Sequence, residues 1–209
     1  MTVDDGVEPA VDLAPAIAEL RRMLRADQVL TDAASLDAYA HDDAEWAPYE
    51  PPLAVVLAER EPDVSAVVRL AAASGLRVVP RGAGTGLSGG ANAMARSIVL
   101  SLERMTSIVE VNAAERYVVA EAGVINDTLR EAVAGYGLWY PPDPASYRIS
   151  TIGGNVATNA GGICCVKYGV TRDYVLGLRV VLADGGVVAL GRRTAKGVPS
   201  DPTMSAVRS

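Results

Sequence analysis

A glycine-rich segment, Pro80–Ala91 with the sequence PRGAGTGLSGGA, has the residue types best suited to chemistry in this chain. It carries glycines at positions 82, 84, 86, 89 and 90. Glycine has no Cβ, so its backbone N–H groups can approach a ligand that side chains would keep away. Several exposed amides in succession form a concave anion-binding site. The segment predicts a site for a phosphorylated ligand, with a diphosphate as the expected group.

Three other interpretations of this segment are weaker. Gly84, Gly86 and Gly89 satisfy G-x-G-x-x-G, and Glu103 stands where a Rossmann fold places its ribose-binding acid. Only about seven residues separate Ala91 from the next apolar run, too few for the crossover of a dozen residues or more that such a fold needs. A Walker loop lacks its Gly-Lys-Ser/Thr. A turn without a ligand stays open, although unused glycines weaken a fold.

Two further segments combine rigid backbone with short polar side chains. PPDPAS at residues 141–146 has prolines that fix an extended backbone. TIGGNVATNAGG at residues 151–162 offers Asn155, Thr158 and Asn159 among four glycines. Such a surface suits a flat ring with polar edges. The residues alone therefore predict a large phosphorylated cofactor that spans the three segments.

The residues that could bind a metal are few. Cys164 and Cys165 are the only cysteines, and a bridge between neighbours is strained, so two free thiols in a reducing compartment are expected. His41 is the only histidine and lies far away in sequence, so no metal site is expected. We interpret His41 as a solvated loop residue.

The periodicity of apolar residues predicts the elements that must position these segments. We expect an amphipathic helix at 11–26, a loop at 41–52, buried strands at 53–59, 76–80 and 97–102, a helix at 61–74 and another at 126–136. Residues 107–123 and 178–191 read as hairpins, the second around Asp184-Gly185. The fold class expected is α+β with two lobes, one mainly parallel and one mainly antiparallel.

Composition excludes several classes of protein. The 209 residues are 50% hydrophobic and 21% charged, with a net charge of -6. That charge disfavours nucleic-acid binding. No stretch reaches the roughly 18 apolar residues of a membrane span, and the first ten residues lack the features of a signal peptide. A cytoplasmic protein is expected.

The order of motifs adds a resemblance to a known family. PRGAGTGLSGG, PPDP, TIGGNVATNAGG, KYGVTRDYVLGL and VVLADGGVV follow one another in the chain. From about Pro51 to Lys196 they resemble the FAD-binding domain of the glycolate oxidase large subunit and D-lactate dehydrogenase, within the vanillyl-alcohol oxidase superfamily. The resemblance implies an FAD-binding domain at 49–196, with lobes at about 49–104 and 105–196. The residue patterns predict a helical lead segment at 1–48 and an irregular tail at 197–209, which has no period and no apolar run.

The resemblance also implies a noncovalent FAD between the lobes. Thr85 stands where superfamily members with covalent FAD often carry the attaching histidine, and attachment to Cys164 or Cys165 is disfavoured. The first loop would hold the diphosphate, and the second and third segments would line the ribityl chain and the ring, with Gly123 as a weaker candidate. The expected cofactor-binding residues are Arg81, Gly82, Ala83, Gly84, Thr85, Gly86, Leu87, Ser88, Gly123, Pro142, Asp143, Pro144, Ser146, Ile152, Gly153, Gly154, Asn155, Thr158, Asn159, Gly161 and Gly162.

The chain departs from the family after Gly197. Relatives continue into a last FAD-contacting stretch and a substrate-binding cap, whereas this sequence reads VPSDPTMSAVRS. The resemblance implies an FAD-linked oxidoreductase acting on CH–OH groups of 2-hydroxy acids, by hydride transfer to flavin. A small 2-hydroxy acid would bind only if a cap, or a partner chain, completes the site. No catalytic residue is assigned. The alternatives are an inactive truncated or split-gene remnant and, more weakly, an enzyme that binds another nucleotide.

Overall fold

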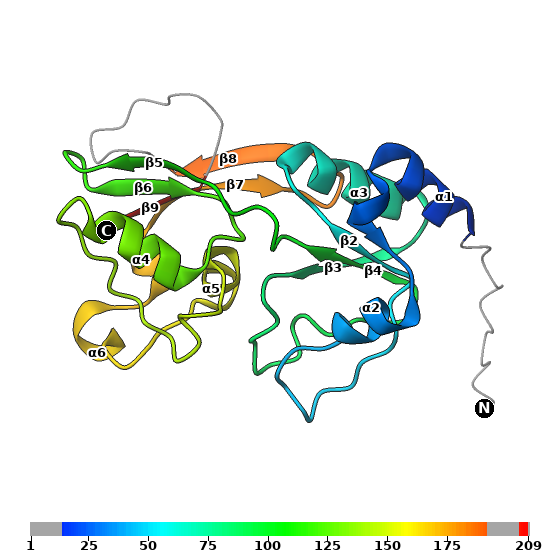
Figure 1. The fold of residues 1–209 in the computed structure, drawn as a ribbon, viewed down its shortest axis with the longest axis horizontal. Coiled ribbons are helices and arrows are strands. Elements are labelled where there is room, and N and C mark those ends of the chain that lie inside the picture. Colours follow the sequence, from blue (N-terminus) through cyan, green and yellow to red (C-terminus); the bar gives the residue numbers. More distant parts are fainter. Residues whose placement is uncertain (1–13, 192–204, 209) are drawn as a thin grey trace, which may run out of the picture.

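Two sheets, each with its own helices, make up the computed structural model, which describes residues 14–191 and 205–208. Sheet A has the strand order β1-β2-β4-β3, and sheet B has the order β5-β6-β9-β7-β8. Both sheets, with their helices, are seen side by side in Figure 1. The expected α+β class with one mainly parallel and one antiparallel sheet is confirmed.

Sheet A is parallel except at one edge, where β1 runs antiparallel to β2. All residues of β2 and β4 are buried, because these two strands are central and have helices on both faces. The elements of this lobe are α1 (Ala14–Met23), a 3-10 turn (Ala26–Gln28), β1 (Val29–Leu30), α2 (Ala33–Ala38), β2 (Ala54–Leu57), α3 (Glu61–Ala73), β3 (Arg77–Arg81) and β4 (Ser97–Ser101).

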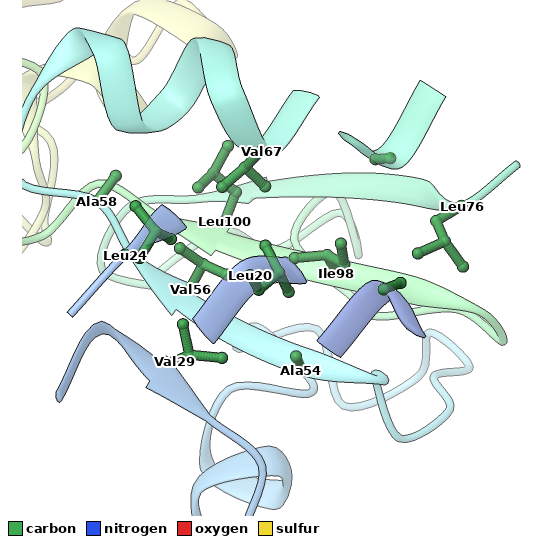
Figure 2. Close-up of a cluster of buried hydrophobic side chains, with 12 residues drawn as sticks. Leu20, Leu24, Val29, Ala54, Val56, Ala58, Val67, Leu76, Ile98 and Leu100 are labelled. Atoms are coloured by element: carbon green, nitrogen blue, oxygen red, sulfur yellow. The ribbon is translucent and has the colours of Figure 1, made fainter. Parts of the chain in front are cut away.

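The alternation of side chains along β2 divides the first lobe into two cores. Val56 faces α1 and α3, where it packs with Leu20, Val67, Ile98 and other apolar residues (Figure 2). Val55 and Leu57 face the other side, toward α2. A strand with apolar residues on both faces requires this double cover.

The predicted lead segment contributes to the same lobe. Leu20 of α1 is fully buried in the core, and Val29 of β1 pairs with Val56 of β2. Residues 1–13, which include the expected start of the helix at Val11, lie outside the described residues. From Ala14 onward, the lead segment therefore packs against sheet A.

Sheet B is antiparallel throughout, with α4 and α5 on one face. Leu129 and Val133 of α4 and Ile152 of α5 pack there against Val118 and Ala120 of β6. The elements of this lobe are β5 (Ile108–Asn112), β6 (Tyr117–Ala120), α4 (Asn126–Ala134), α5 (Ile152–Thr158), α6 (Cys165–Tyr168), a 3-10 turn (Thr171–Asp173), β7 (Val175–Val181), β8 (Val187–Gly191) and β9 (Ser205–Arg208).

The tail differs from the sequence expectation. No regular element is expected at 197–209, yet Ser205–Arg208 forms β9 between β6 and β7. A central strand pairs on both sides, so hydrogen bonding to its neighbours can fix a segment whose own sequence shows no strand pattern. Residues 192–204 and 209 lie outside the described part of the chain.

The hairpin turn of β7 and β8 docks on α3 of the other lobe. Ser65 Oγ and Arg69 Nη2 both donate to the carbonyl of Gly185, at 2.5 and 3.0 Å. Arg179 of β7 also pairs with Glu61 at the start of α3, with Nη2 2.6 Å from Oε1. These contacts fix the angle between the lobes at one end.

No helix in the described ranges is long and apolar enough to cross a membrane.

The Gly185 contact yields a stability prediction with a matched control. Gly185 has φ +75°, and a Cβ there would lie 2.3 Å from Arg69 Cγ and 2.9 Å from the Ser65 carbonyl. Gly137 has φ +70° with nothing within 4 Å. Both Gly→Ala changes strain the backbone, but only Gly185→Ala also overpacks the lobe contact. We expect Gly185→Ala to lose about 1–3 kcal/mol more than Gly137→Ala in urea unfolding. Equal losses would contradict a steric role at this contact.

Candidate functional site

The glycine-rich segment connects β3 to β4, two adjacent parallel strands. Residues 82–96 contain no helix, so the connection is not the crossover of a Rossmann fold. Gly84 and Gly89 have φ of +74° and +72°, a region that favours glycine. The loop therefore uses its glycines for backbone conformation as well as for close approach.

The segment 41–48 holds this loop from one side, a role that the sequence did not suggest. Asp42 is buried, and its backbone N–H donates to Asn92 Oδ1 at 2.8 Å. Its carboxylate accepts from the N–H of Ala44 at 3.0 Å and of Ala91 at 3.4 Å. The Asp43 N–H donates to the Gly84 carbonyl at 3.1 Å. The expected connecting loop is thus a brace for the glycine loop.

The third predicted segment contains a helix, α5, that glycine content did not predict. Thr151 caps it, because Thr151 Oγ1 accepts from the Gly154 N–H at 3.1 Å. Asn155 is buried, where its Oδ1 accepts from Asn126 and its Nδ2 donates to Ser150 Oγ. The side-chain amide of Asn155 thus makes its hydrogen bonds within the protein, and these bonds hold α5 in place.

The second segment packs against the end of the third. A Cβ on Gly162 would lie 2.2 Å from Asp143 Oδ1 and 2.3 Å from the Asp143 carbonyl. Asp143 Oδ1 also accepts from the Cys164 N–H at 3.4 Å. The two segments expected to line one ring system therefore form one surface.

The lobes meet where the glycine loop contacts the third segment. A Cβ on Gly82 of the first lobe would lie 2.4 Å from Thr151 Oγ1 of the second. Within the second lobe, a Cβ on Gly153 would lie 2.7 Å from Ala122 Cβ. The Gly153 N–H donates to the Ala122 carbonyl at 2.8 Å. The predicted segments thus form one continuous surface that crosses the lobe junction.

The predicted residues differ in their exposure. Ala83, Leu87, Ser88 and Thr158 are exposed, and Gly123, Pro142, Ile152 and Asn155 are buried. The remaining predicted residues are half-buried, as expected for a surface that a ligand could cover. The buried four support the site from behind, and their contact with a cofactor stays a prediction.

The titratable residues beside the site are mostly acidic. A pocket opens next to the glycine loop and is lined by His41, Asp42, Asp43, Ala44, Glu45 and Tyr49. The exposed His41 ring lies 5.0 Å from the Tyr49 ring. Cys164 and Cys165 are free thiols, and a hydrogen bond to Asp143 raises the pKa of the Cys164 thiol. Among the described residues no group of three or more metal-binding side chains occurs.

A glycine loop at the junction of two α+β lobes is an arrangement that suits a phosphorylated ligand. Residues 52–191 match the family model described as FAD binding domain. The chain belongs to this family, the FAD-binding domain of the vanillyl-alcohol oxidase superfamily.

Two named relatives of this family match most of the chain. It is 41% identical over 183 residues to D-2-hydroxyglutarate dehydrogenase of Xanthomonas citri pv. viticola, covering 87% of the chain and 38% of that protein. It is 42% identical over 147 residues to glycolate oxidase subunit GlcD of Bacillus subtilis, covering 70% of the chain and 31% of that protein. The chain thus spans well under half the length of these relatives.

Solved structures show the same fold. 4-Ethylphenol oxidase from Gulosibacter chungangensis matches with a TM-score of 0.74 and 29% identity, over 90% of this chain and 36% of that one. An alkyldihydroxyacetonephosphate synthase matches with a TM-score of 0.78 and 20% identity, over 99% of this chain and 42% of that one.

A substitution at Gly123 tests whether this residue supports the fold or contacts the cofactor. A Cβ there would lie 2.1 Å from the Leu102 carbonyl oxygen and 2.7 Å from that of Met105. We expect Gly123→Ala to lower the free energy of unfolding by about 1–3 kcal/mol, because the lobe junction must move apart. Gly90→Ala, with nothing within 4 Å, should stay within about 0.5 kcal/mol of wild type in the same urea titration. A stable Gly123→Ala protein that fails to bind FAD would instead assign Gly123 to the cofactor alone.

Proposed function

We propose that this chain is the FAD-binding module of an oxidoreductase that acts on 2-hydroxy acids. The observation that carries the proposal is the meeting of the glycine loop and the third segment at Gly82 and Thr151. There, the glycine loop of one lobe lies beside the polar third segment of the other, so a single ligand could contact both. Membership in the FAD-binding family and the names of the relatives, which include glycolate oxidase and D-2-hydroxyglutarate dehydrogenase, support the choice of cofactor and substrate class.

The residues of the chain fit the chemical groups of FAD. The loop Arg81–Ser88 offers amides and a cation for the diphosphate. The surface formed by Pro142–Ser146 and Gly153–Gly162 offers short polar groups and little side-chain bulk for the ribityl chain and the ring. When bound, FAD accepts a hydride, and the protein contributes orientation and exclusion of water.

The groups that would act on the substrate are not assigned. Oxidation of a 2-hydroxy acid needs a cation for its carboxylate and a base within about 3 Å of its hydroxyl proton. The single histidine, His41, lies in the brace beside the glycine loop. We therefore propose that a cap, either in the same protein or in a partner chain, supplies these groups.

A second candidate is that these 209 residues bind FAD without turnover of their own. The observation that favours it is the extent of the match, because the chain spans 38% of the first relative named above. A cytoplasmic location is proposed for either function, and the free Cys164 and Cys165 thiols support a reducing compartment.

Binding and turnover separate the two candidates. The purified chain is titrated with FAD by absorption and fluorescence, and reduction of a dye acceptor is followed with D-lactate, glycolate and D-2-hydroxyglutarate. We expect weak FAD binding and no turnover by the chain alone, because a cofactor held by the two lobes alone stays partly open to water. Gly84→Val should bind no FAD, since its side chain resists φ +74° and blocks the loop. Equal affinity in Gly84→Val, or no binding by wild type at millimolar FAD, contradicts the proposal. Turnover near that of an intact relative would reveal an unassigned base.

We also propose that FAD is bound without a covalent bond. A threonine at position 85 has no nucleophilic ring nitrogen to attach the flavin. After acid precipitation of the loaded protein, all yellow colour should remain in the supernatant. Colour in the washed pellet would indicate attachment, and Cys164→Ser and Cys165→Ser variants would then identify the residue.

A further inference from the structure

Arg81 is a half-buried cation at the start of the glycine loop. It ends β3, and its guanidinium lies over the open face of Gly84, where a Cβ would be 2.2 Å from Nη2. Its Nη1 donates to the His41 carbonyl at 2.7 Å. Burial lowers the pKa of Arg81, although the guanidinium remains charged at neutral pH.

The charge of Arg81 has no carboxylate in direct contact. Glu103, Asp42 and Asp43 act on it through space, yet none forms an ion pair with it among the described residues. A guanidinium has five N–H donors, and the described residues use one of them. Partial burial of a charge raises the free energy of the folded protein unless an opposite charge lies beside it. The free donors and the charge therefore point to an anion above the loop.

Tyr39 and Glu103 fix where that guanidinium lies. The Tyr39 ring is 5.5 Å from Arg81 Cζ, within the range of a cation–π contact. The Tyr39 hydroxyl donates to Glu103 Oε1 at 2.5 Å, so the ring cannot turn away. Burial, with the Glu103 hydrogen bond, raises the pKa of Tyr39 to about 12. The phenol therefore stays protonated and keeps this bond at neutral pH.

From these contacts we infer that Tyr39 and Glu103 are positioning residues, which hold Arg81 over Gly84 as the cation that binds the diphosphate of the cofactor. The inference rests on the proposed function and adds two residues from outside the glycine loop to its site. It assigns Glu103 a different task from the ribose contact that a Rossmann interpretation would give it. Tyr39 follows α2 and Glu103 follows β4, so the positioning pair ties a helix and a strand of the first lobe to the loop.

A structural role for Tyr39 would look different from a positioning role. If Tyr39 only stabilised the fold, its removal would lower the stability of the protein and its affinity for every ligand, whether or not Arg81 was present. If it acts through Arg81, its removal has no further effect once Arg81 is gone. A double-mutant cycle measures this difference directly.

The test uses the full chain and two ligands that contain a diphosphate, FAD and ADP, each titrated to millimolar concentration. We expect Tyr39→Leu and Arg81→Gln each to raise Kd for both ligands about tenfold, the effect of one charge-assisted hydrogen bond. The double variant should bind no worse than Arg81→Gln alone. Tyr39→Phe, which keeps the ring, and Glu103→Gln, which keeps an acceptor, should lose less than Tyr39→Leu. Tyr136→Leu is the matched control, because its side chain is exposed after α4 in the second lobe and should leave Kd unchanged.

A second measurement needs no ligand. The Nε–H signal of Arg81 in the NMR spectrum of the free protein, assigned with Arg81→Gln, reports whether the guanidinium is held. We expect a dispersed signal in wild type and in Tyr136→Leu, and a signal at the position of a free arginine in Tyr39→Leu. Thermal unfolding shows which variants are folded, and Tyr39→Phe with Glu103→Gln replaces Tyr39→Leu if the latter is not.

The outcomes separate this inference from the proposed function. Additive losses in the double variant, or an unchanged Arg81 signal in Tyr39→Leu, overturn the inference even when FAD binds. Binding of ADP that depends on Arg81, and on Tyr39 only while Arg81 is present, with no binding of FAD, supports the inference and rejects the flavin function. Failure of wild type to bind either ligand rejects both.

Discussion

The structure depends most on a backbone contact at the lobe junction, where Gly123 lies against the connection between β4 of the first lobe and β5 of the second. Its N–H donates to the Met105 carbonyl at 2.8 Å, and the space beside its Cα is occupied by the Leu102 carbonyl. Packed backbone does not yield as a flexible side chain does, so this contact sets the distance between the sheets. The docking of Gly185 on α3 fixes the angle at the other end. Together they hold Gly82 against Thr151, which is where the cofactor surface crosses from one lobe to the other.

Much of this fold could be predicted from the sequence because its central elements are locally consistent. β2 and β4 are apolar runs buried on both faces, and α3 has acids in its first turn and a glycine at Gly75 after its end. The hairpin at Asp184-Gly185 follows from turn chemistry, since Gly185 has φ +75°. The glycine loop was identifiable for the same reason, because its residue types have few uses other than positive φ and close approach.

The parts that could not be predicted depend on contacts between distant residues. α5 contains two glycines near its start, which disfavour a helix locally, and Asn155 is fixed by Asn126 across 29 residues. The brace at Asp42 meets Asn92 across 50 residues, and Tyr39 meets Glu103 across 64. β1 has two residues, too few for a period. β9 has the sequence SAVR, which shows no strand pattern, and is formed by pairing with β6 and β7. Such elements form because they contact distant residues, and a single sequence does not show which residues those are.

The electrostatics of the site also could not be derived from bulk charge. A net charge of -6 and the acidic pocket beside the loop would repel a diphosphate at long range. Screening limits that repulsion to about 10 Å at 0.1 M salt, whereas a half-buried guanidinium in direct contact is screened much less. The balance is therefore decided within a few ångströms of the loop. In a chain of this charge, affinity for an anion depends less on how many cations are present than on how firmly one of them is held at the loop, and Arg81 is the cation that the structure holds there.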